Sequence, residues 1–482
     1  MIFRLEIGFA LKKWTRWFSL LSLLVLVFPL IPAKAQQTQP DQPVYVVQEG
    51  DTLWEIAQRF HVSLDDLVRV NDITDPARIA SGDQLIIPGL TGIKGVLTTQ
   101  PVTYGETLRS ISRKLGVNQQ TLARLNHLSS PVELYAGYSL VVPLTEGGIP
   151  PAQRAMISPR ETLLEQAVLL GANPWQLALR NNLAGLAQAI PGDILLFTGE
   201  DDGGPSALPE GIRAVALDPI PLQQGKAASV KVVTPMAINL SGSLVDHPLH
   251  FFSLNEETYA ALQGIHAMAE PGLYPLQLQG QLEDGSQFAF SQMVPVSAVN
   301  YPFDTPLVVD PATVDPAVTE PEDEIWSALM EPATPERLWD GVFRLPSPLP
   351  VDYCLETNEC WSSRFGNRRS YNGSPYLYFH TGLDVVGKVG TEIYAPAPGV
   401  VVFAGPLTVR GNATVINHGW GVYTAYMHQS EILVEVGERV ETGQLIGRVG
   451  ATGRVQGPHL HWEVWAGGVQ VDPLDWLQRS YP

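Results

Sequence analysis

The stretch at residues 457–464, GPHLHWEV, places two histidines two positions apart in an otherwise mostly apolar run. A glycine and a proline end the preceding loop, and the residues after them are typical of a strand. Alternate side chains of a strand point to the same face, so His459 and His461 share one face while Leu460 points to the other. Glu463 has the same parity and is open to either a contact with the site or a structural role. The stretch therefore predicts a strand that delivers two imidazoles to one site.

A second motif, HTGLD at residues 380–384, brings a histidine and an aspartate within four residues. This spacing puts His380 and Asp384 on one side of a strand or a helix, and the glycine and the valines that follow favour the strand. Imidazole nitrogen and carboxylate oxygen are common zinc ligands. A further histidine, His428, follows Tyr-Met, and on its own such a histidine is usually structural.

These four histidines and one aspartate are enough for a hydrolytic zinc site. Three of them can hold the ion, and two histidines remain to move protons or to stabilise an oxyanion. Zinc lowers the pKa of a bound water to about 7, which makes hydroxide available at neutral pH. The chain has no H-E-x-x-H motif, so the glutamate base of helical zinc proteases is absent.

The C-terminal region resembles the lysostaphin-type (LytM-like) zinc endopeptidases. The matching stretches, in the family's order, are residues 364–368, 380–384, 390–395, 399–401, 417–421, 426–428, 437–447 and 457–464. The resemblance implies a mostly antiparallel β domain, the duplicated hybrid motif of the family, with a groove across it. It also implies one Zn²⁺ held by His380, Asp384 and His461, with His428 and His459 as the catalytic pair. Arg368 matches an arginine taken as structural, and His418 is expected to be a turn or surface histidine.

The N-terminal half repeats with a period of 55 residues. GDTL at 50–53 recurs as GETL at 105–108 and RETL at 160–163, and an asparagine recurs at 71, 126 and 181. Within a repeat the pattern predicts strand, helix, helix, strand. The first two copies resemble LysM modules, which implies binding to glycans that contain N-acetylglucosamine. The third copy is degraded, with Arg160 for the first glycine and no closing proline, so a packing role alone is the favoured interpretation there.

The middle of the chain changes character twice. Residues 225–300 alternate apolar and polar positions between turn signals, which predicts a small antiparallel β-sandwich with a weak resemblance to immunoglobulin-like domains. Residues 304–340 are rich in proline and acidic residues, so we expect an extended linker in which 324–330 could form a short helix.

The N-terminus predicts export. Basic residues precede an apolar run at 18–32, and AKA at 33–35 is a cleavage pattern. An uncleaved anchor is the alternative, but two prolines interrupt the run, so cleavage is favoured. In an exported protein the neighbouring Cys354 and Cys360 are most simply a disulfide, although free thiols or metal ligation stay open. The net charge of −19 argues against a nucleic-acid partner.

Together these patterns predict a multidomain exported protein of α+β repeats, a β-sandwich and a β catalytic domain. The expected segments are a signal peptide (1–35), LysM modules (44–88 and 96–143), a degenerate LysM-like module (153–199), an immunoglobulin-like sandwich (225–300), an acidic linker (301–341) and a zinc peptidase domain (342–482).

The function that this organisation implies is a peptidoglycan hydrolase of the cell envelope, extracellular or periplasmic. We expect it to act as a monomer with no membrane span once the signal is removed. Two alternatives remain: a non-enzymatic activator of wall amidases, from which the family's metal ligands have been lost, and a secreted zinc protease that acts on proteins.

Overall fold

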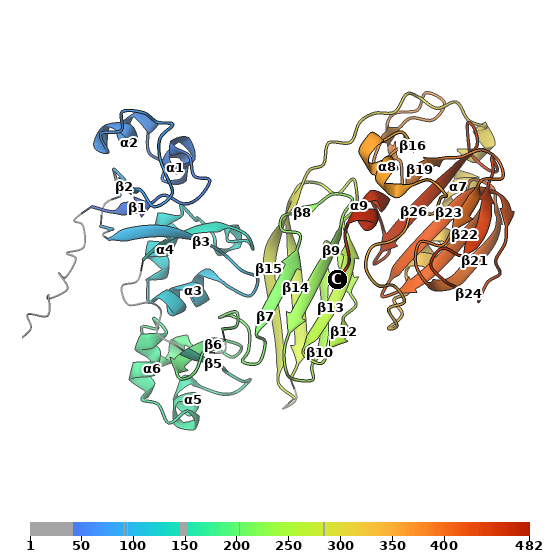
Figure 1. Cartoon of the computed structure of the whole chain (residues 1–482). Coiled ribbons are helices and arrows are strands. Elements are labelled where there is room, and N and C mark those ends of the chain that lie inside the picture. The colour runs from blue at the N-terminus through green and yellow to red at the C-terminus, as the bar shows by residue number, and fades with distance from the viewer. Residues whose placement is uncertain (1–41, 91, 94, 145–151, 202, 283–284) are drawn as a thin grey trace, which may run out of the picture. The chain divides into compact units, whose positions relative to one another are not determined.

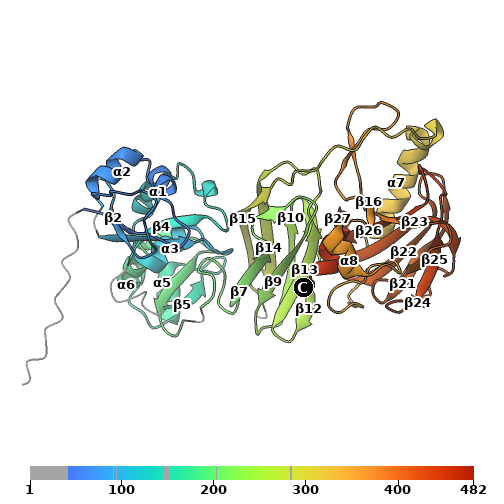
Figure 2. The ribbon, with the colours of Figure 1, turned by 45° about the horizontal axis from the view of Figure 1, so that its top comes forward.

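A computed structural model describes residues 42–90, 92–93, 95–144, 152–201, 203–282 and 285–482 (Figures 1 and 2). The expected signal segment, residues 1–35, lies outside these ranges. Within them, no helix combines the length and the apolar character that crossing a membrane requires.

Each of the three N-terminal repeats folds in the predicted order of strand, helix, helix and strand. The elements are β1 Val44–Val46, α1 Leu53–Arg59, α2 Leu64–Val70 and β2 Gln84–Ile86; β3 Val96–Pro101, α3 Leu108–Leu115, α4 Gln119–Leu125, the 3₁₀ helix η1 Pro131–Glu133 and β4 Ser139–Pro143; and β5 Ala152–Met156, α5 Leu163–Leu169, α6 Pro174–Arg180, η2 Leu186–Gln188 and β6 Ile194–Thr198. A threonine caps the first helix of every repeat by accepting a hydrogen bond from the backbone N–H three residues later.

The asparagine that recurs in each repeat ties the second helix to the closing strand. The Asn126 side chain donates to the carbonyls of Leu122 and Val141, both at 2.8 Å, and accepts from the Val141 N–H at 2.6 Å. Asn71 and Asn181 make the same three bonds in their own repeats. The third repeat therefore keeps the fold although its sequence has diverged.

Two sheets form the middle of the chain. The strands are β7 Ala214–Asp218, β8 Leu222–Gln223, β9 Ala227–Val233, β10 Asn239–Leu244, β11 His247–Leu249, β12 Phe252–Asn255, β13 Thr258–Gly264, β14 Gly272–Gln281 and β15 Gln287–Ser297. One sheet has the order β11-β10-β14-β15-β8 and the other β12-β13-β9-β7. Side chains of both sheets, such as Val230, Ala261 and Leu276, are fully buried in one shared core. The immunoglobulin-like class of this region stays a prediction.

The expectation of an extended linker is wrong for residues 316–323, and the short helix considered for 324–330 is present as the second half of a longer helix. This stretch forms helix α7, Pro316–Met330, after a short 3₁₀ helix, η3 Pro311–Thr313. Asp315 caps the helix and Pro316 occupies its first turn, where a proline costs no hydrogen bond. Asp315 and Pro316, which contributed to the linker prediction, are therefore the residues that start this helix.

Helix α7 is held by one buried face. Glu322, Trp326 and Met330 are four residues apart, so they lie on one side of the helix, and all three are buried. Trp326 and Met330 pack in one cluster with Val415 and Tyr423 of the C-terminal sheet. In Figure 2 the helix, in yellow, lies beside these strands.

The C-terminal region is built on a ten-stranded sheet. Its strands are β16 Trp361–Ser363, β19 Leu383–Val386, β20 Glu392–Tyr394, β21 Gly399–Leu407, β22 Gly411–Gly419, β23 Val422–Ile432, β24 Arg439–Val440, β25 Leu445–Val449, β26 His459–Ala466 and β27 Val469–Val471, joined by the ribbon β17 Arg368–Arg369 with β18 Tyr378–Phe379 and by helices α8 Val351–Thr357 and α9 Pro473–Gln478. The main path runs β16-β19-β26-β23-β22-β21-β24, and every pairing is antiparallel.

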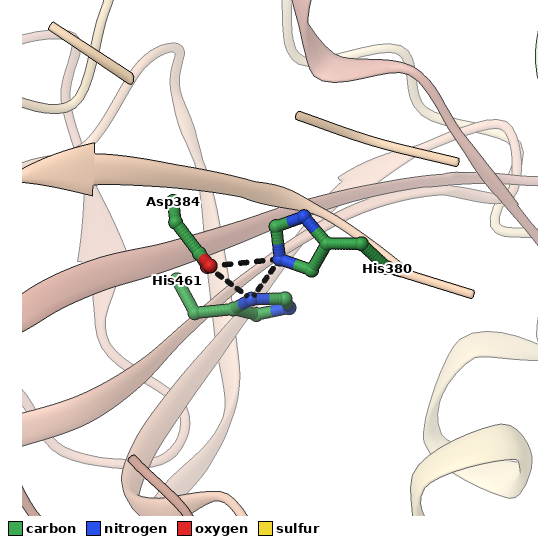
Figure 3. Close-up of side chains that lie close together, drawn as sticks. All are labelled: His380, Asp384 and His461. Carbon is green, nitrogen blue, oxygen red and sulfur yellow. Dashed lines mark hydrogen bonds and ion pairs between the residues drawn. The ribbon is translucent and has the colours of Figure 1, made fainter. Parts of the chain in front are cut away.

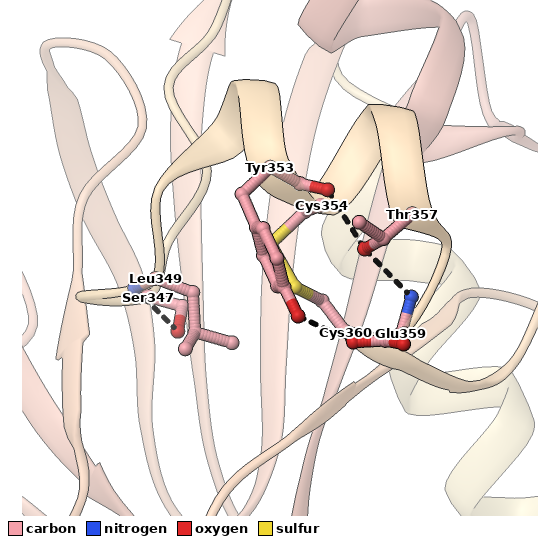
Figure 4. The surroundings of a disulfide bond; sticks show 7 residues. All are labelled: Ser347, Leu349, Tyr353, Cys354, Thr357, Glu359 and Cys360. Atoms are coloured by element: carbon pink, nitrogen blue, oxygen red, sulfur yellow. Dashed lines mark hydrogen bonds between the residues drawn. A yellow bond between two sulfur atoms is a disulfide. The ribbon is translucent and has the colours of Figure 1, made fainter.

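A disulfide closes a short loop at the start of this region (Figure 4). Cys354 lies in α8, and Cys360 follows six residues later. Both are buried in the main core of the sheet. Asn358 ends α8 in the left-handed conformation and donates its N–H to the Cys354 carbonyl, which turns the chain back toward the sheet.

We expect Asn126→Ala to loosen the second repeat locally. The substitution leaves the buried Val141 N–H and carbonyl without their partner, which costs about 1–3 kcal/mol. Amide hydrogen exchange should report faster opening of β4 and no change in β2 or β6. Gln120→Ala, at an exposed position of the same helix, is the control. Equal protection of β4 in both variants would contradict this role of the asparagine.

Candidate metal centre

Three side chains from neighbouring elements meet on the C-terminal sheet (Figure 3). His380 follows β18, Asp384 lies in β19, and His461 lies in β26 directly opposite Asp384 in the strand register. Asp384 Oδ1 is 2.9 Å from His380 Nε2 and 2.8 Å from His461 Nδ1, and the two imidazole nitrogens are 3.0 Å apart. All three residues are buried, and these are donor atoms that could hold a metal ion.

The outward-facing atoms of each side chain are also held. His380 Nδ1 lies 2.8 Å from the Arg364 carbonyl, so Nδ1 carries the proton and the Nε2 lone pair faces the centre. Asp384 Oδ2 accepts from Arg369 at 2.9 Å, which leaves Oδ1 for the centre. His461 Nε2 lies 3.3 Å from Glu463 Oε1. Such outer contacts orient metal-binding side chains.

The electrostatics of this centre favour a cation. Burial alone would raise the pKa of Asp384, but the charges and hydrogen bonds of His380 and His461 outweigh it and hold that pKa well below its usual value. Burial also opposes ionisation of Glu463, yet the hydrogen bond and charge of His461 lower its pKa to about 2. Two buried carboxylates therefore flank His461, and positive charge is favoured between them.

The two histidines respond to this field in different directions. Burial is the main cause that lowers the pKa of His380 to about 4, although the charge of Asp384 opposes it. Burial also acts to lower the pKa of His461, but the hydrogen bonds to Asp384 and Glu463 raise it above the ordinary value. His461 therefore sits where positive charge is most favoured.

The remaining two predicted histidines lie beside the trio. The rings of His428 and His459 are 5.1 Å apart, and His459 Nε2 is 3.5 Å from Asp384 Oδ1. His428 Nδ1 lies 2.8 Å from the Thr452 carbonyl and His459 Nδ1 the same distance from the Gly457 carbonyl. Each imidazole thus holds its proton on Nδ1 and keeps Nε2 as an acceptor. Burial is the main cause that lowers the pKa of His428 to about 3.

Two hollows meet at this centre. One is bordered by α7 residues and the other by residues 304–309 and 455–459. Both are lined by Arg369, Tyr371, His428, Arg454 and His461. A substrate that reached the trio would therefore lie against α7, residues 304–309 and residues 455–459.

Arg368 makes a structural contact, as expected, whereas His418 does not lie where it was expected. Arg368 donates to the Tyr376 carbonyl at 2.9 Å, whereas the next residue, Arg369, contacts Asp384. His418 is fully buried in β22, with Nδ1 2.7 Å from the Pro398 carbonyl and Nε2 2.8 Å from Thr424 Oγ1. The expectation of a turn or surface histidine is therefore wrong, because the strand turns this side chain into the core.

Three groups at the centre were not predicted from the sequence: Arg369, Asp304 and Trp326. Arg369 forms an ion pair with Asp384, Asp304 lies on the far side of Arg369, and Trp326 donates to Glu463. In a strand, neighbouring side chains point to opposite faces. The position of Arg369 beside the motif residue Arg368 was therefore the one signal available for it. No local pattern gave the other two a role, because Asp304 begins the run that was expected to be a linker and Trp326 lies where only a short helix was considered.

Comparison with known proteins places two kinds of domain in the chain. Residues 378–473 match the model of peptidase family M23, and residues 45–88 and 102–143 match the LysM domain. The chain therefore carries an M23 peptidase domain and two LysM domains, which confirms both resemblances. The third repeat lies outside the LysM matches.

Named relatives are similar to the peptidase domain. The chain is 42% identical over 112 residues to the peptidoglycan DD-endopeptidase ShyC of Vibrio cholerae, which covers 23% of this chain and 26% of that protein. It is 42% identical over 116 residues to the DD-carboxypeptidase/endopeptidase Mpg of Neisseria meningitidis, with the same two coverages. The chain thus spans about a quarter of the length of these relatives.

A solved structure of the lysostaphin catalytic domain from Staphylococcus simulans is also similar. It is 28% identical, with a TM-score of 0.24, and the match covers 27% of this chain and 98% of that one.

We expect Glu463→Gln to weaken divalent metal binding at this centre by about 10–100-fold. The substitution removes the negative charge beside His461 Nε2 and keeps the side-chain size. Competition with a coloured chelator measures the affinity. Glu435→Gln, at an exposed site in the same region, serves as the control. Equal affinities in the two variants would show that Glu463 has no part in orienting His461.

Proposed function

We propose that this chain, which carries an M23 peptidase domain and two LysM domains, is an exported peptidoglycan hydrolase that cuts wall peptides at a single zinc site. One observation carries the proposal: the donor atoms of His380, Asp384 and His461 lie within about hydrogen-bond distance of one another, with two further histidines beside them. These five residues would supply the metal ligands and the proton-transfer groups of a hydrolytic zinc site. They lie on the sheet expected from the family resemblance.

The residues present fit a zinc ion. Two imidazole nitrogens and one carboxylate oxygen are a ligand set that zinc favours in catalytic sites, where a further position stays open. His380, Asp384 and His461 would hold the ion, and each is already oriented by a contact on its outer atoms. When bound, zinc supplies Lewis acidity, which makes hydroxide available near neutral pH and polarises a peptide carbonyl.

His428 and His459 are proposed to handle protons. Because both keep Nε2 as an acceptor, either can take a proton at that atom and return it to the leaving amine. The low pKa of His428 keeps it unprotonated in the absence of substrate. Arg369 and Glu463 hold the neighbouring ligands and take no proton themselves.

The wall substrate rests on the LysM domains and on the relatives that are named as peptidoglycan endopeptidases. The LysM domains would hold the enzyme on glycan, which raises the local concentration of wall peptides without a new catalytic contact. The middle sheets, as an immunoglobulin-like domain, would act as a spacer. We place the monomeric protein in the cell envelope, after removal of its signal segment.

Two other functions receive less support. A non-enzymatic activator of wall amidases needs no metal ligands, whereas all five expected residues are present here and four are buried. A secreted protease for protein substrates would use the same five residues, so the products distinguish it from the wall hydrolase.

We expect the protein without residues 1–35 to release peptide fragments from peptidoglycan, to stop when a chelator is added, and to recover with zinc. His428→Ala should reduce the rate by about 10²–10⁴-fold, because a proton-transfer group is lost. The variant should keep its zinc. His250→Ala, at an exposed histidine far along the chain, should have no effect.

Mass analysis of the released fragments identifies the bond. Cleavage within the cross-linking peptides supports the proposal. Full activity in His428→Ala, or hydrolysis of casein but not of peptidoglycan, would contradict it. Release that requires an added amidase would favour the activator function.

We expect oligomers of N-acetylglucosamine to displace the protein from insoluble peptidoglycan while hydrolysis of a short soluble wall peptide continues at an unchanged rate. The reason is that the LysM domains bind glycan independently of the metal site. A sedimentation assay measures the binding, and sucrose at equal concentration is the control. Retention on the wall at saturating oligomer would contradict glycan tethering.

A further inference from the structure

We propose that the segment 302–330, which precedes the matched peptidase domain, is part of the metal centre. Two of its side chains act as positioning residues: Asp304 positions Asp384 through Arg369, and Trp326 positions His461 through Glu463. The inference rests on the proposed function in one respect, namely that His380, Asp384 and His461 bind zinc.

The beginning of this segment pairs with the ribbon beside the centre. Phe303 and Leu307 form parallel bridges with Arg368 and Tyr371. The Asp304 N–H donates to the Arg368 carbonyl at 2.9 Å, and further backbone bonds continue the pairing through Leu307. The backbone therefore fixes Asp304 next to Arg369, as an added strand at the edge of a sheet does.

The Asp304 side chain is fully engaged with groups of the centre. Its Oδ1 accepts from Asn367 at 2.7 Å, and its Oδ2 accepts from Ser363 at 3.1 Å. Arg369 lies between two carboxylates, with Nε 3.5 Å from Asp304 and Nη2 2.9 Å from Asp384. The Asp304 contact is an ion pair without a hydrogen bond from Nε, and a carboxylate on each side of the planar guanidinium favours one orientation. Asp304 therefore directs Arg369 onto Asp384 Oδ2, and Asp384 Oδ1 is left for the metal.

Ser363 extends this first link to another ligand. Its Oγ lies 3.2 Å from His380 Nδ1 and also accepts from Arg369 at 3.1 Å. The same hydroxyl thus touches Asp304, Arg369 and His380. Loss of the Asp304 charge would remove one contact of Arg369 and disturb the surroundings of two metal ligands at once.

The second link runs from helix α7. Trp326 Nε1 donates to Glu463 Oε2 at 3.1 Å, and Trp465 Nε1 donates to the same oxygen at 2.8 Å. The other oxygen accepts from Thr381 at 2.6 Å and faces His461 Nε2. A buried carboxylate needs its hydrogen bonds, because each unmet bond costs free energy and loosens its position. Trp326 supplies one of them from outside the matched domain.

The α7 helix is anchored firmly enough to carry this contact. Glu322 accepts from the backbone N–H groups of residues 408–410 at 2.8–3.0 Å and from the Arg410 side chain at 3.0 Å. The Arg410 carbonyl in turn accepts from the His428 N–H at 3.0 Å. The helix is thereby tied to the loop that supports His428 as well as to Glu463.

The test measures zinc affinity, by chelator competition, in the chain without residues 1–35. Trp326→Phe removes one N–H donor and keeps most of the ring. Asp304→Asn removes one charge at nearly constant size. We expect each to weaken zinc binding by about tenfold, as the loss of outer contacts to metal ligands does. Asp304→Glu should recover part of the affinity by restoring the charge.

Matched controls separate positioning from stability. Trp476 is another buried tryptophan of this region, and its indole N–H has no hydrogen-bond partner among the described residues, so Trp476→Phe repeats the aromatic change without losing a bond. Asp340→Asn repeats the charge change at an exposed position of the same upstream run. Both controls should bind zinc as the parent protein does. Unfolding temperature is measured for all variants.

The outcomes are distinct. Weaker zinc binding in Trp326→Phe and Asp304→Asn, but not in the controls, supports the inference. Affinities equal to those of the controls, with or without a lower unfolding temperature, would overturn it. If Trp326→Phe fails to fold, Asp304→Asn decides the question alone. A parent protein that binds no zinc would contradict the proposed function itself.

Discussion

Asp384 stands opposite His461 in the antiparallel pairing of β19 with β26, and the proposed metal centre depends on that register. The pairing sets a carboxylate oxygen 2.8 Å from an imidazole nitrogen in a buried position. A slip of one residue would turn His461 to the opposite face and leave the aspartate without it. An unpaired buried charge is strongly unfavourable, so the sheet register and the chemistry of the centre stabilise each other.

The buried charges explain why so many surrounding residues are polar. Asp384 requires Arg369, and Arg369 is held in turn by Asp304. Glu463 requires hydrogen-bond donors, and one of them is the indole of Trp326. Each buried charge is satisfied by a group farther from the centre. This series of contacts ends at helix α7 and at residues 302–309. These segments lie ahead of the residues matched to the peptidase family, yet they complete its polar network.

The sequence predicts the inner part of the centre well, because the signals there are local. Strand parity alone places His459 and His461 on one face, and the four-residue spacing joins His380 to Asp384. The outer part depends on contacts between distant segments, which periodicity does not encode. Only the second half of helix α7 was anticipated, because the prolines and acidic residues of its first half are typical of a linker. Only the tertiary structure shows that Glu322 and Trp326 face the sheet. Arg369 was missed because the stretch that matches the family, residues 364–368, ends at its neighbour Arg368.

His380, Asp384 and His461 are proposed to bind one zinc ion together. X-ray absorption at the zinc edge of the loaded protein tests this most directly. We expect two imidazole nitrogens and a carboxylate oxygen at about 2.0–2.2 Å, and one imidazole fewer in His380→Ala and in His461→Ala. An imidazole count that is unchanged in both variants would show that the zinc lies elsewhere and would contradict this ligand set.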